Sequence, residues 1–258
     1  MQRKCISNVL TMHPTLKKAF DQSRVLKVIS GLNNFNAKSV AATVKAADRG
    51  GASFVDIAAD PDLVRLVRGL TNLPICVSAV EPNQFVLATE AGADLIEIGN
   101  FDSFYASGRR FEAEEVLALT KKTRSLLPDI TLSVTVPHIL KLDQQVQLAE
   151  ELVQAGADII QTEGGTSSTP RSAGTLGLIE KAAPTLAVAY EISRAVPVPV
   201  LCASGLSNVT VPMAIAAGAA GVGVGSAINQ LDNEVAMVAA VRSLVEALAT
   251  VTPVRVHV

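Results

Sequence analysis

The sequence predicts a single (β/α)8 barrel, and the prediction rests on an internal repeat and on the rhythm of the apolar segments around it. Four times, the end of an expected helix runs through a turn of small residues into a short apolar strand. Four more apolar runs alternate with these copies, so eight strands and eight helices occupy roughly 235 residues, which is typical of a closed parallel barrel. An open doubly wound sheet is the alternative, but no GxGxxG turn follows the first strand.

Each copy of the repeat contains a glycine directly after the expected helix. A glycine there accepts the left-handed backbone of a helix C-cap, and the apolar run that follows predicts a short buried strand. The glycines are Gly51, Gly92, Gly156 and Gly218, and the copies cover residues 49–57, 91–98, 155–162 and 217–224. These copies supply the even-numbered strands of the barrel.

The odd-numbered strands lie between the copies, and three of them follow a proline-marked turn. They are expected at residues 25–30, 75–79, 132–136 and 200–204. Helical patterns predict helices at residues 37–48, 62–69, 82–91, 113–127, 142–155, 177–196, 209–217 and 233–250. Residues 1–20 are expected to form an N-terminal extension with a short helix, and residues 21–258 the TIM barrel itself.

The composition narrows the possible partners. Hydrophobic residues make up 49% of the chain and charged residues 18%, which favours strands that are buried on both faces. A net charge of −2 and the lack of a basic stripe argue against nucleic acid, and no apolar run is long enough to span a membrane. Three cysteines without close pairing indicate a reducing compartment. The final helix, rich in alanine and valine, suits packing on its own barrel or on a second copy, so a homo-oligomer is possible.

Closure of the barrel predicts which side chains point inward, because each interior layer takes side chains from alternate strands. Counting from the repeated glycines places Asp56, Glu97, Gln161 and Gly223 in one layer. Glu163 and Gly225 belong to the next layer, nearer the carboxyl ends of the strands. On the odd strands, polarity nominates Lys27, Cys76 with Ser78, Ser133 with Thr135, and Cys202 with Ser204.

Four charged residues in these layers are candidates for catalysis: Lys27, Asp56, Glu97 and Glu163. Buried acids are costly unless they are paired, so the alternative interpretation is that Lys27 neutralises Asp56 or Glu97 in a structural network. Two nearby carboxylates hold a lysine protonated, which favours ion pairing over imine formation. Proton transfer is therefore the preferred chemistry, with Glu163 as the base and Gln161 orienting a substrate or a neighbouring acid.

The turns after the last two strands predict a phosphate site. Barrels of this type usually hold phosphate after strands seven and eight, and glycines let backbone N–H groups approach an anion closely. Ser226 is also expected to begin a short helix, whose first N–H groups favour negative charge. The expected phosphate ligands are Ser204, Gly205, Gly223, Gly225 and Ser226. Tight packing without a ligand is the alternative interpretation of these glycines.

Polar loops at the same end of the barrel predict substrate contacts. The candidates are Asn33, Asn34, Asn100, Thr135, His138 and Gln161, although Pro137 is able to turn His138 outward. The other two histidines, His13 and His257, lie near the termini, so no cluster has metal-ligand spacing and no metal is expected. Residues 164–170 have small side chains, which suits a lid over a substrate or a simple linker.

Several strings in these loops resemble a known family. Residues 27–35, 97–105, 132–138 and 161–164 resemble the conserved hypothetical chloroplast reading frame family, number twenty-three, of cyanobacteria and algal plastids. The resemblance runs from about residue 16 to residue 248. It implies a barrel protein of the cyanobacterial cytoplasm or the plastid stroma, and it implies no particular reaction.

Three functions fit these features. The first is a metal-independent lyase, isomerase or synthase that acts on a small phosphorylated metabolite by acid–base chemistry. The second is a non-catalytic metabolite sensor or partner-binding barrel, because no clear pair of nucleophile and base is present. The third is binding of FMN, whose phosphate suits the same turns, although residues 225–227 lack the arginine that flavin barrels usually carry there.

Overall fold

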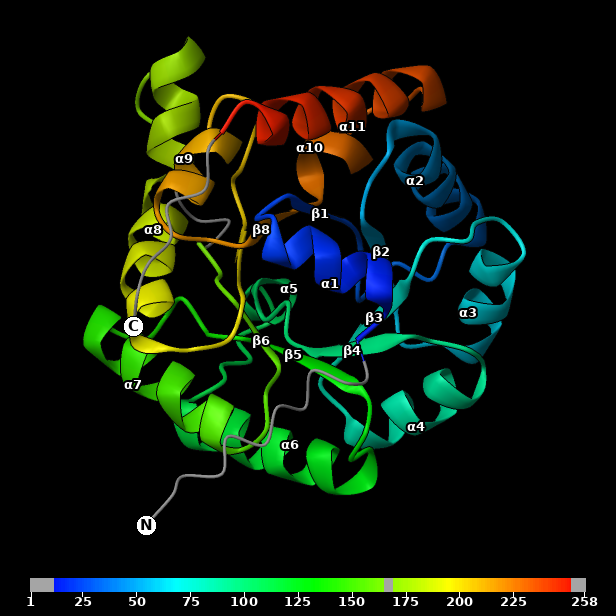
Figure 1. The fold of residues 1–258 in the computed structure, drawn as a ribbon, viewed down its shortest axis with the longest axis vertical. Coiled ribbons are helices and arrows are strands. Elements are labelled where there is room, and N and C mark those ends of the chain that lie inside the picture. The colour runs from blue at the N-terminus through cyan, green and yellow to red at the C-terminus, as the bar shows by residue number, and fades with distance from the viewer. Residues whose placement is uncertain (1–11, 165–168, 252–258) are drawn as a thin grey trace.

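The strands close into a parallel barrel, in agreement with the prediction. The computed structural model describes residues 12–164 and 169–251, so Cys5, His257 and most of the segment 164–170 lie outside it. Each strand pairs in parallel with the next, and β8 pairs with β1 to complete the ring (Figure 1). The strands are β1 Val25–Gly31, β2 Phe54–Ala58, β3 Ile75–Ala79, β4 Leu95–Ile98, β5 Thr131–Thr135, β6 Ile159–Gln161, β7 Val200–Ala203 and β8 Gly221–Val224.

Most of the helices form an outer ring around the strands, whereas α1 and α5 lie over the centre of the ring in Figure 1. The bounds of the predicted helices lie close to the expected ones. One helix, α5, was not predicted, because four residues are too short to show a helical period. The helices are α1 Pro14–Asp21, α2 Ala37–Gly50, α3 Pro61–Arg68, α4 Pro82–Glu90, α5 Asp102–Tyr105, α6 Ala113–Leu126, α7 Leu142–Gln154, α8 Gly174–Ala195, α9 Val211–Ala216, α10 Ser226–Asn229 and α11 Glu234–Ala249.

The repeated glycine turns have the backbone conformation that the sequence predicts. Gly51, Gly92, Gly156 and Gly218 have φ angles of 86°, 110°, 101° and 105°. A side chain is strained in this left-handed region, so glycine is favoured at all four turns. The turns set the point at which each even strand begins, and therefore the layer in which its side chains lie.

The amino end of the barrel is closed by an apolar plug. Side chains from six strands meet there with Leu16 and Phe20 of α1, which lies across the centre of the ring in Figure 1. The strand residues of this plug are Val25, Phe54, Cys76, Leu95, Ile159 and Leu201. The plug leaves only the carboxyl end of the barrel for a ligand, which is where the polar layers lie.

One strand register differs from the prediction. Cys202 was expected inside the barrel, but its sulfur lies 3.7 Å from the carbonyl oxygen of Thr185 on α8, so it faces the helices. Leu201 and Ala203 point inward instead, since Leu201 belongs to the plug and Ala203 lines the pocket at the carboxyl end. No repeated turn precedes β7, so the sequence alone provided no anchor for its register.

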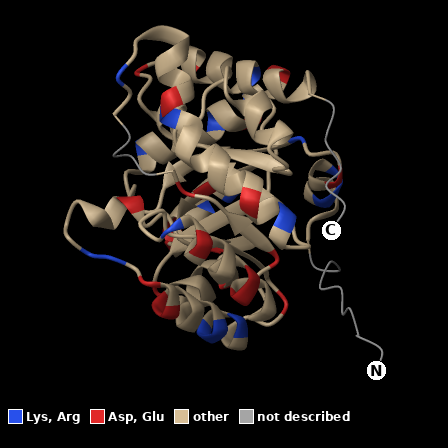
Figure 2. Ribbon diagram, turned by 90° about the vertical axis from the view of Figure 1, so that its left-hand side faces the viewer, with Lys and Arg blue, Asp and Glu red and all other residues tan. Residues whose placement is uncertain are grey.

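The last helix packs on its own barrel. α11 contacts α2 and α9, and a β-carbon at Gly50 would meet the side chain of Val241 at 2.4 Å. Over the described residues, we find no helix with both the length and the apolar character to cross a membrane. Acidic and basic residues are interspersed over the face drawn in Figure 2.

Candidate functional site

A single pocket at the carboxyl ends of the strands gathers most of the predicted site. Its volume is about 540 Å³, within the usual range for small-molecule sites. All five expected phosphate ligands line it, as do four of the other expected site residues. The residues that matter below are Asn100, Asp102, Thr135, Gln161, Glu163, Lys181, Ser204, Gly205, Gly223, Gly225 and Ser226.

One side of the pocket consists of the turns after β7 and β8, which we call the lip: Ser204, Gly205, Gly225 and Ser226. Ser204 and Gly205 both have left-handed backbones, with φ angles of 78° and 71°. This conformation is costly for a serine and tends to persist where function requires it. A β-carbon at Gly205 would lie 2.7 Å from the carbonyl oxygen of Lys181, so no larger residue fits there without a shift.

Lys181 brings a positive charge to the lip. It lies on α8, is partly buried and lines the same pocket as Ser204 and Gly205. Sequence reasoning missed this residue because a lysine in the middle of a long helix carries no local signal of a site. The packing of α8 against β7 is what brings it to the pocket.

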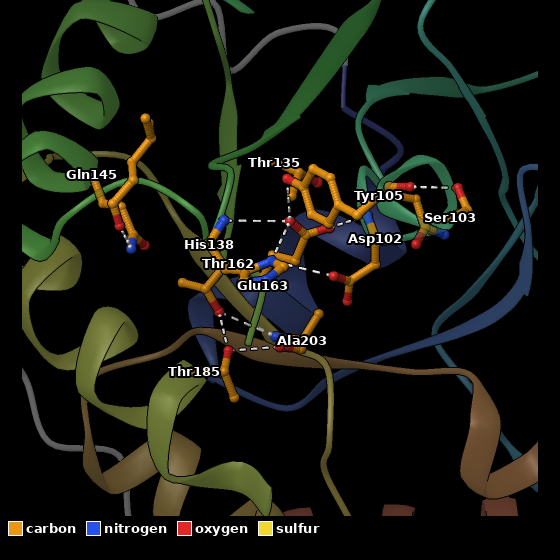
Figure 3. A network of polar contacts seen from close by, with 12 residues as sticks. Asp102, Ser103, Tyr105, Thr135, His138, Gln145, Thr162, Glu163, Thr185 and Ala203 are labelled. Carbon is orange, nitrogen blue, oxygen red and sulfur yellow. Dashed lines mark hydrogen bonds and ion pairs between the residues drawn. The ribbon is translucent and has the colours of Figure 1, made fainter. Parts of the chain in front are cut away.

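On the other side of the pocket lie Asp102 and Glu163, whose carboxylates flank the imidazole of His138 (Figure 3). His138 is not itself among the residues that line the pocket. We call these three residues the mouth cluster. His138 Nδ1 lies 3.2 Å from Asp102 Oδ1 and 3.1 Å from Glu163 Oε2. Their side chains are 20%, 10% and 5% exposed, in the order His138, Asp102, Glu163. The three residues follow β5, β4 and β6, so adjacent strands deliver them to one place.

Glu163 is held by several donors. Its Oε1 accepts the backbone N–H of Asp102 at 2.9 Å, and its Oε2 accepts the Tyr105 hydroxyl at 3.2 Å. The backbone N–H of His138 also points at Oε2, at 3.3 Å. These three donors fix the positions of both carboxylate oxygens of Glu163.

The turn after β4 positions Asp102 and Tyr105. Asn100 has a left-handed backbone, with φ of 66°, and Gly99 before it has φ of 155°. A β-carbon at Gly99 would lie 2.2 Å from Thr135 Oγ1, so only glycine lets β4 approach β5 so closely. This turn leads directly into α5, whose first and last residues are Asp102 and Tyr105.

The surroundings of the mouth cluster shift two pKa values. The hydrogen bond to Glu163 raises the pKa of His138, burial opposes this, and the charges of Glu163 and Asp102 add to the increase. Burial and the nearby Glu163 raise the pKa of Tyr105. His138 is thereby held closer to its protonated form than an exposed histidine, and Tyr105 stays a neutral donor.

Beneath the pocket lies a second polar group, which we call the core network. It consists of the charged residues Lys27, Asp56 and Glu97 and the amide of Gln161. Lys27 Nζ lies 2.6 Å from Glu97 Oε2 and 3.7 Å from Asp56 Oδ2, and it donates to Gln161 Oε1 at 3.1 Å. Gln161 Nε2 in turn donates to Glu97 Oε1 at 2.8 Å. The interior layer that the sequence predicted is thus brought together around Lys27.

The core network is closed to solvent, and this shifts its pKa values. Burial alone would lower the pKa of Lys27, but the charges of Asp56 and Glu97 outweigh it and hold the pKa above its usual value. Burial, opposed by Lys27, raises the pKa of Asp56 to about 6. Lys27, Asp56 and Glu97 are not among the residues that line the pocket. The geometry therefore favours the structural interpretation of these three residues.

Gln161 and Thr135 form the boundary between the core network and the pocket. The Nε2 group of Gln161 has a second contact, to Thr135 Oγ1 at 3.2 Å. Both polar ends of Gln161 are therefore engaged within the protein, although the residue lines the pocket. Thr135 accepts from Gln161 and so keeps its own O–H group as a donor.

Three of the expected substrate contacts do not line the pocket: Asn33, Asn34 and His138. His138 belongs to the mouth cluster, whereas Asn33 and Asn34 lie in the loop before α2. Asn34 Nδ2 donates to the hydroxyls of Ser30 and Ser39, and its Oδ1 accepts the backbone N–H of Asn36. These are the contacts of a residue that orders the loop before α2.

The structure contradicts the argument from which no metal was expected. That prediction rested on the lack of ligand spacing along the chain, but the ligand atoms of Asp102, His138 and Glu163 all lie within 4.8 Å of one another. The three residues are far apart in sequence, and only the closure of the barrel brings them together.

The fold and the pocket define this protein as a (β/α)8 barrel with a pocket at the carboxyl ends of its strands. Comparison with known families makes the assignment particular. The chain belongs to the family described as "Protein of unknown function (DUF561)", whose model matches residues 12–253. The family resemblance predicted from the sequence strings is therefore confirmed.

Relatives in two algae show the same family. The chain is 49% identical over 197 residues to "Uncharacterized protein ycf23" of Cyanophora paradoxa, which covers 76% of this chain and 81% of the relative. It is 40% identical over 200 residues to the protein of the same name in Porphyra purpurea, covering 78% and 76%. These relatives are encoded in algal plastid genomes.

Solved structures share the barrel at low sequence identity. A 3-hexulose-6-phosphate synthase superposes with a TM-score of 0.62 at 17% identity, covering 86% of this chain and 99% of that one. A geranylgeranylglyceryl phosphate synthase from Thermoplasma acidophilum, in complex with sn-glycerol-1-phosphate, has a TM-score of 0.61 at 14% identity, covering 92% and 99%. At these identities the likeness establishes the common fold.

Proposed function

We propose that the pocket binds a small phosphorylated metabolite and that the protein acts on it by acid–base chemistry, as a lyase, isomerase or synthase. The observation that carries this proposal is the division of one pocket into two unlike halves. The lip and Lys181 form a half suited to an anion, and the mouth cluster forms a half suited to proton transfer. A ligand in a pocket of about 540 Å³ reaches both.

Three properties support the lip as the phosphate-binding half. Glycines at 205 and 225 allow close approach to the backbone, and the strained Ser204 presents a hydroxyl beside them. Lys181 supplies the charge that neutral groups lack. The names of two structurally similar barrels refer to phosphorylated compounds, a hexulose 6-phosphate and a glyceryl phosphate, which is consistent with this assignment.

In the other half, His138 and Glu163 act as one acid–base unit. The oxygens of Glu163 already accept hydrogen bonds from Tyr105 and from two backbone N–H groups, so Glu163 is placed to orient a neighbouring base. The imidazole of His138 lies 3.1 Å from Glu163, so a proton taken by the pair resides on the ring. Asp102 on the other side of the ring stabilises the resulting charge.

The relatives bear on where the protein works. Because they are encoded in algal plastid genomes, we place this chain in the plastid stroma or in the cytoplasm of a cyanobacterium.

The proposal is tested at the lip. Binding of glycerol 3-phosphate is measured by isothermal titration calorimetry for the wild type, Ser226→Asp and Lys181→Gln. We expect each variant to weaken binding by at least about tenfold. Lys181→Gln removes a charge-assisted contact worth about 1.5–3 kcal/mol, and Ser226→Asp places a negative charge beside the anion. Ser125→Asp and Lys122→Gln make the same changes on the exposed surface of α6 and are expected to leave binding unchanged.

Equal affinities in all five proteins would contradict the assignment of the lip. The same titration with FMN separates the flavin alternative, because FMN binding that exceeds that of glycerol phosphate would favour a flavin site. A metabolite sensor is distinguished by turnover. If a bound phosphorylated compound is recovered unchanged after long incubation, and its binding depends on Ser226, the sensor is favoured.

A further inference from the structure

We infer that the mouth cluster is a binding site for one divalent transition-metal ion, with Asp102, His138 and Glu163 as its protein ligands. Each residue offers one ligand atom, and the three come from the ends of three adjacent strands. The rigid ring of strands holds their backbones, so the site is assembled without a ligand.

The distances within the cluster fit a coordination sphere. Two ligand atoms that are each about 2.1 Å from a metal, at angles of about 90–109°, lie about 3.0–3.4 Å apart. His138 Nδ1 lies 3.2 Å from Asp102 Oδ1 and 3.1 Å from Glu163 Oε2. The remaining pair, Asp102 and Glu163, falls within the 4.8 Å that spans the whole group. Two of the three ligand–ligand distances therefore already match those of a metal site.

Charge and burial point to the same conclusion. Asp102 and Glu163 have side chains only 10% and 5% exposed, and both approach the same imidazole nitrogen. This nitrogen carries at most one hydrogen, so it cannot donate to both carboxylates at once. A divalent ion at this point balances both charges, which is the usual role of metals among closely spaced buried acids.

The outer contacts of the cluster are those of a metal site. Metal-binding carboxylates are normally fixed by hydrogen bonds from neighbouring groups. Glu163 receives such bonds from the Tyr105 hydroxyl and from the backbone N–H of Asp102. The second bond links one ligand to the next through the main chain, so Asp102 and Glu163 cannot move apart independently.

The ligand set indicates the kind of ion. One imidazole with two carboxylates suits Zn²⁺, Mn²⁺, Fe²⁺ or Co²⁺, whereas Mg²⁺ and Ca²⁺ prefer oxygen ligands alone. Three protein ligands leave positions open, as catalytic metal sites do, and Asp102 and Glu163 both line the pocket. This inference rests on the proposed function only for the ligand. An ion on His138 Nδ1 would take the place of the proton that the His138–Glu163 pair otherwise holds, and it would polarise a carbonyl or hydroxyl oxygen of the substrate.

The inference is tested with the metal alone. The full chain is stripped with EDTA and titrated with ZnCl₂ by calorimetry, and Co²⁺ is followed by its visible absorption. We expect one ion per chain in the wild type. Asp102→Asn and His138→Gln are expected to weaken Zn²⁺ binding by more than about 100-fold, and Tyr105→Phe by about tenfold, the range found for outer contacts.

His13→Gln is the matched control, because His13 is an exposed histidine at the opposite end of the barrel, on the residue before α1. Its affinity should equal that of the wild type. Wild-type binding no tighter than that of His138→Gln, or binding lost in His13→Gln, would overturn the inference. Glycerol phosphate binding is measured on the same samples. A wild type that binds Zn²⁺ but not glycerol phosphate contradicts the proposed function alone. A wild type that binds glycerol phosphate but not Zn²⁺ contradicts the metal site alone.

Discussion

Two groups in this barrel are built to the same plan, a nitrogen cation between two carboxylates. In the core network Lys27 lies between Asp56 and Glu97, and in the mouth cluster His138 lies between Asp102 and Glu163. The core side chains are at most 1% exposed, whereas the ring of His138 is 20% exposed. The cation in the core is permanent, and the one at the mouth gains and loses a proton.

The difference teaches what each group is for. A lysine held by two buried acids stays charged over the whole physiological range and keeps the barrel interior neutralised. A histidine beside a pocket exchanges its proton with solvent, and its place is open to another cation. The predictions below test this division, beginning with the largest expected effect.

Replacement of Lys27 by Met should destabilise the protein most. It leaves Asp56 and Glu97 without their cation in a closed interior, which costs about 3–5 kcal/mol in the free energy of unfolding. Urea unfolding followed by circular dichroism measures the change. If Lys27→Met does not fold, the double variant Lys27→Met with Glu97→Gln should recover part of the loss. A change below about 1 kcal/mol in Lys27→Met would mean that the core network is not structural.

Lowering the pH should stabilise the wild type relative to Asp56→Asn. The pKa of Asp56 is raised to about 6 in the folded protein, so its contribution is fully present below the unfolded value and is lost as the pH rises through about 6. Between pH 7 and pH 5, the unfolding free energy of the wild type should gain about 1.4 kcal/mol over that of the variant. Parallel pH profiles would show that Asp56 titrates normally.

Thr135→Val tests the boundary between the two groups. The change removes the acceptor of one Gln161 N–H and leaves that group buried without a partner, which costs about 1 kcal/mol. The same change removes a hydroxyl from the pocket. It should weaken glycerol phosphate binding less than Lys181→Gln does, and metal binding less than His138→Gln does. Unfolding curves and calorimetry on one preparation measure both effects, and an unchanged stability would separate the core network from the pocket.

Asp102→Asn should have the smallest effect on stability. It removes one of two carboxylates that crowd the same ring, so repulsion is relieved as a favourable contact is lost. We expect the unfolding free energy in EDTA to change by less than about 0.5 kcal/mol. Asp129→Asn, an exposed acid at a loop, is the matched control. A decrease of several kcal/mol in the free energy of unfolding would show that the mouth cluster is structural, like the core network.

Much of the site was predictable because repeated turns set the register of the even strands. Counting from their glycines places Asp56, Glu97, Gln161 and Glu163 in the right layers, and contacts such as Gln161 to Glu97 follow. The register of β7 was not predictable in this way, and Cys202 was placed on the wrong face. Asp102 and Lys181 were not predicted as site residues, since each depends on how a helix packs.

The sequence by itself determined the barrel, its order of elements and the glycine turns at its carboxyl end. These features depend on local periodicity and on backbone preferences, which neighbouring residues specify. Only the tertiary structure decided which charges meet. Closure of the ring placed Lys27 beneath the pocket and brought Asp102, His138 and Glu163 to one point at its mouth. Contacts between residues from different strands depend on how the ring closes and on how far each side chain lies below the pocket. No local pattern in the sequence specifies either.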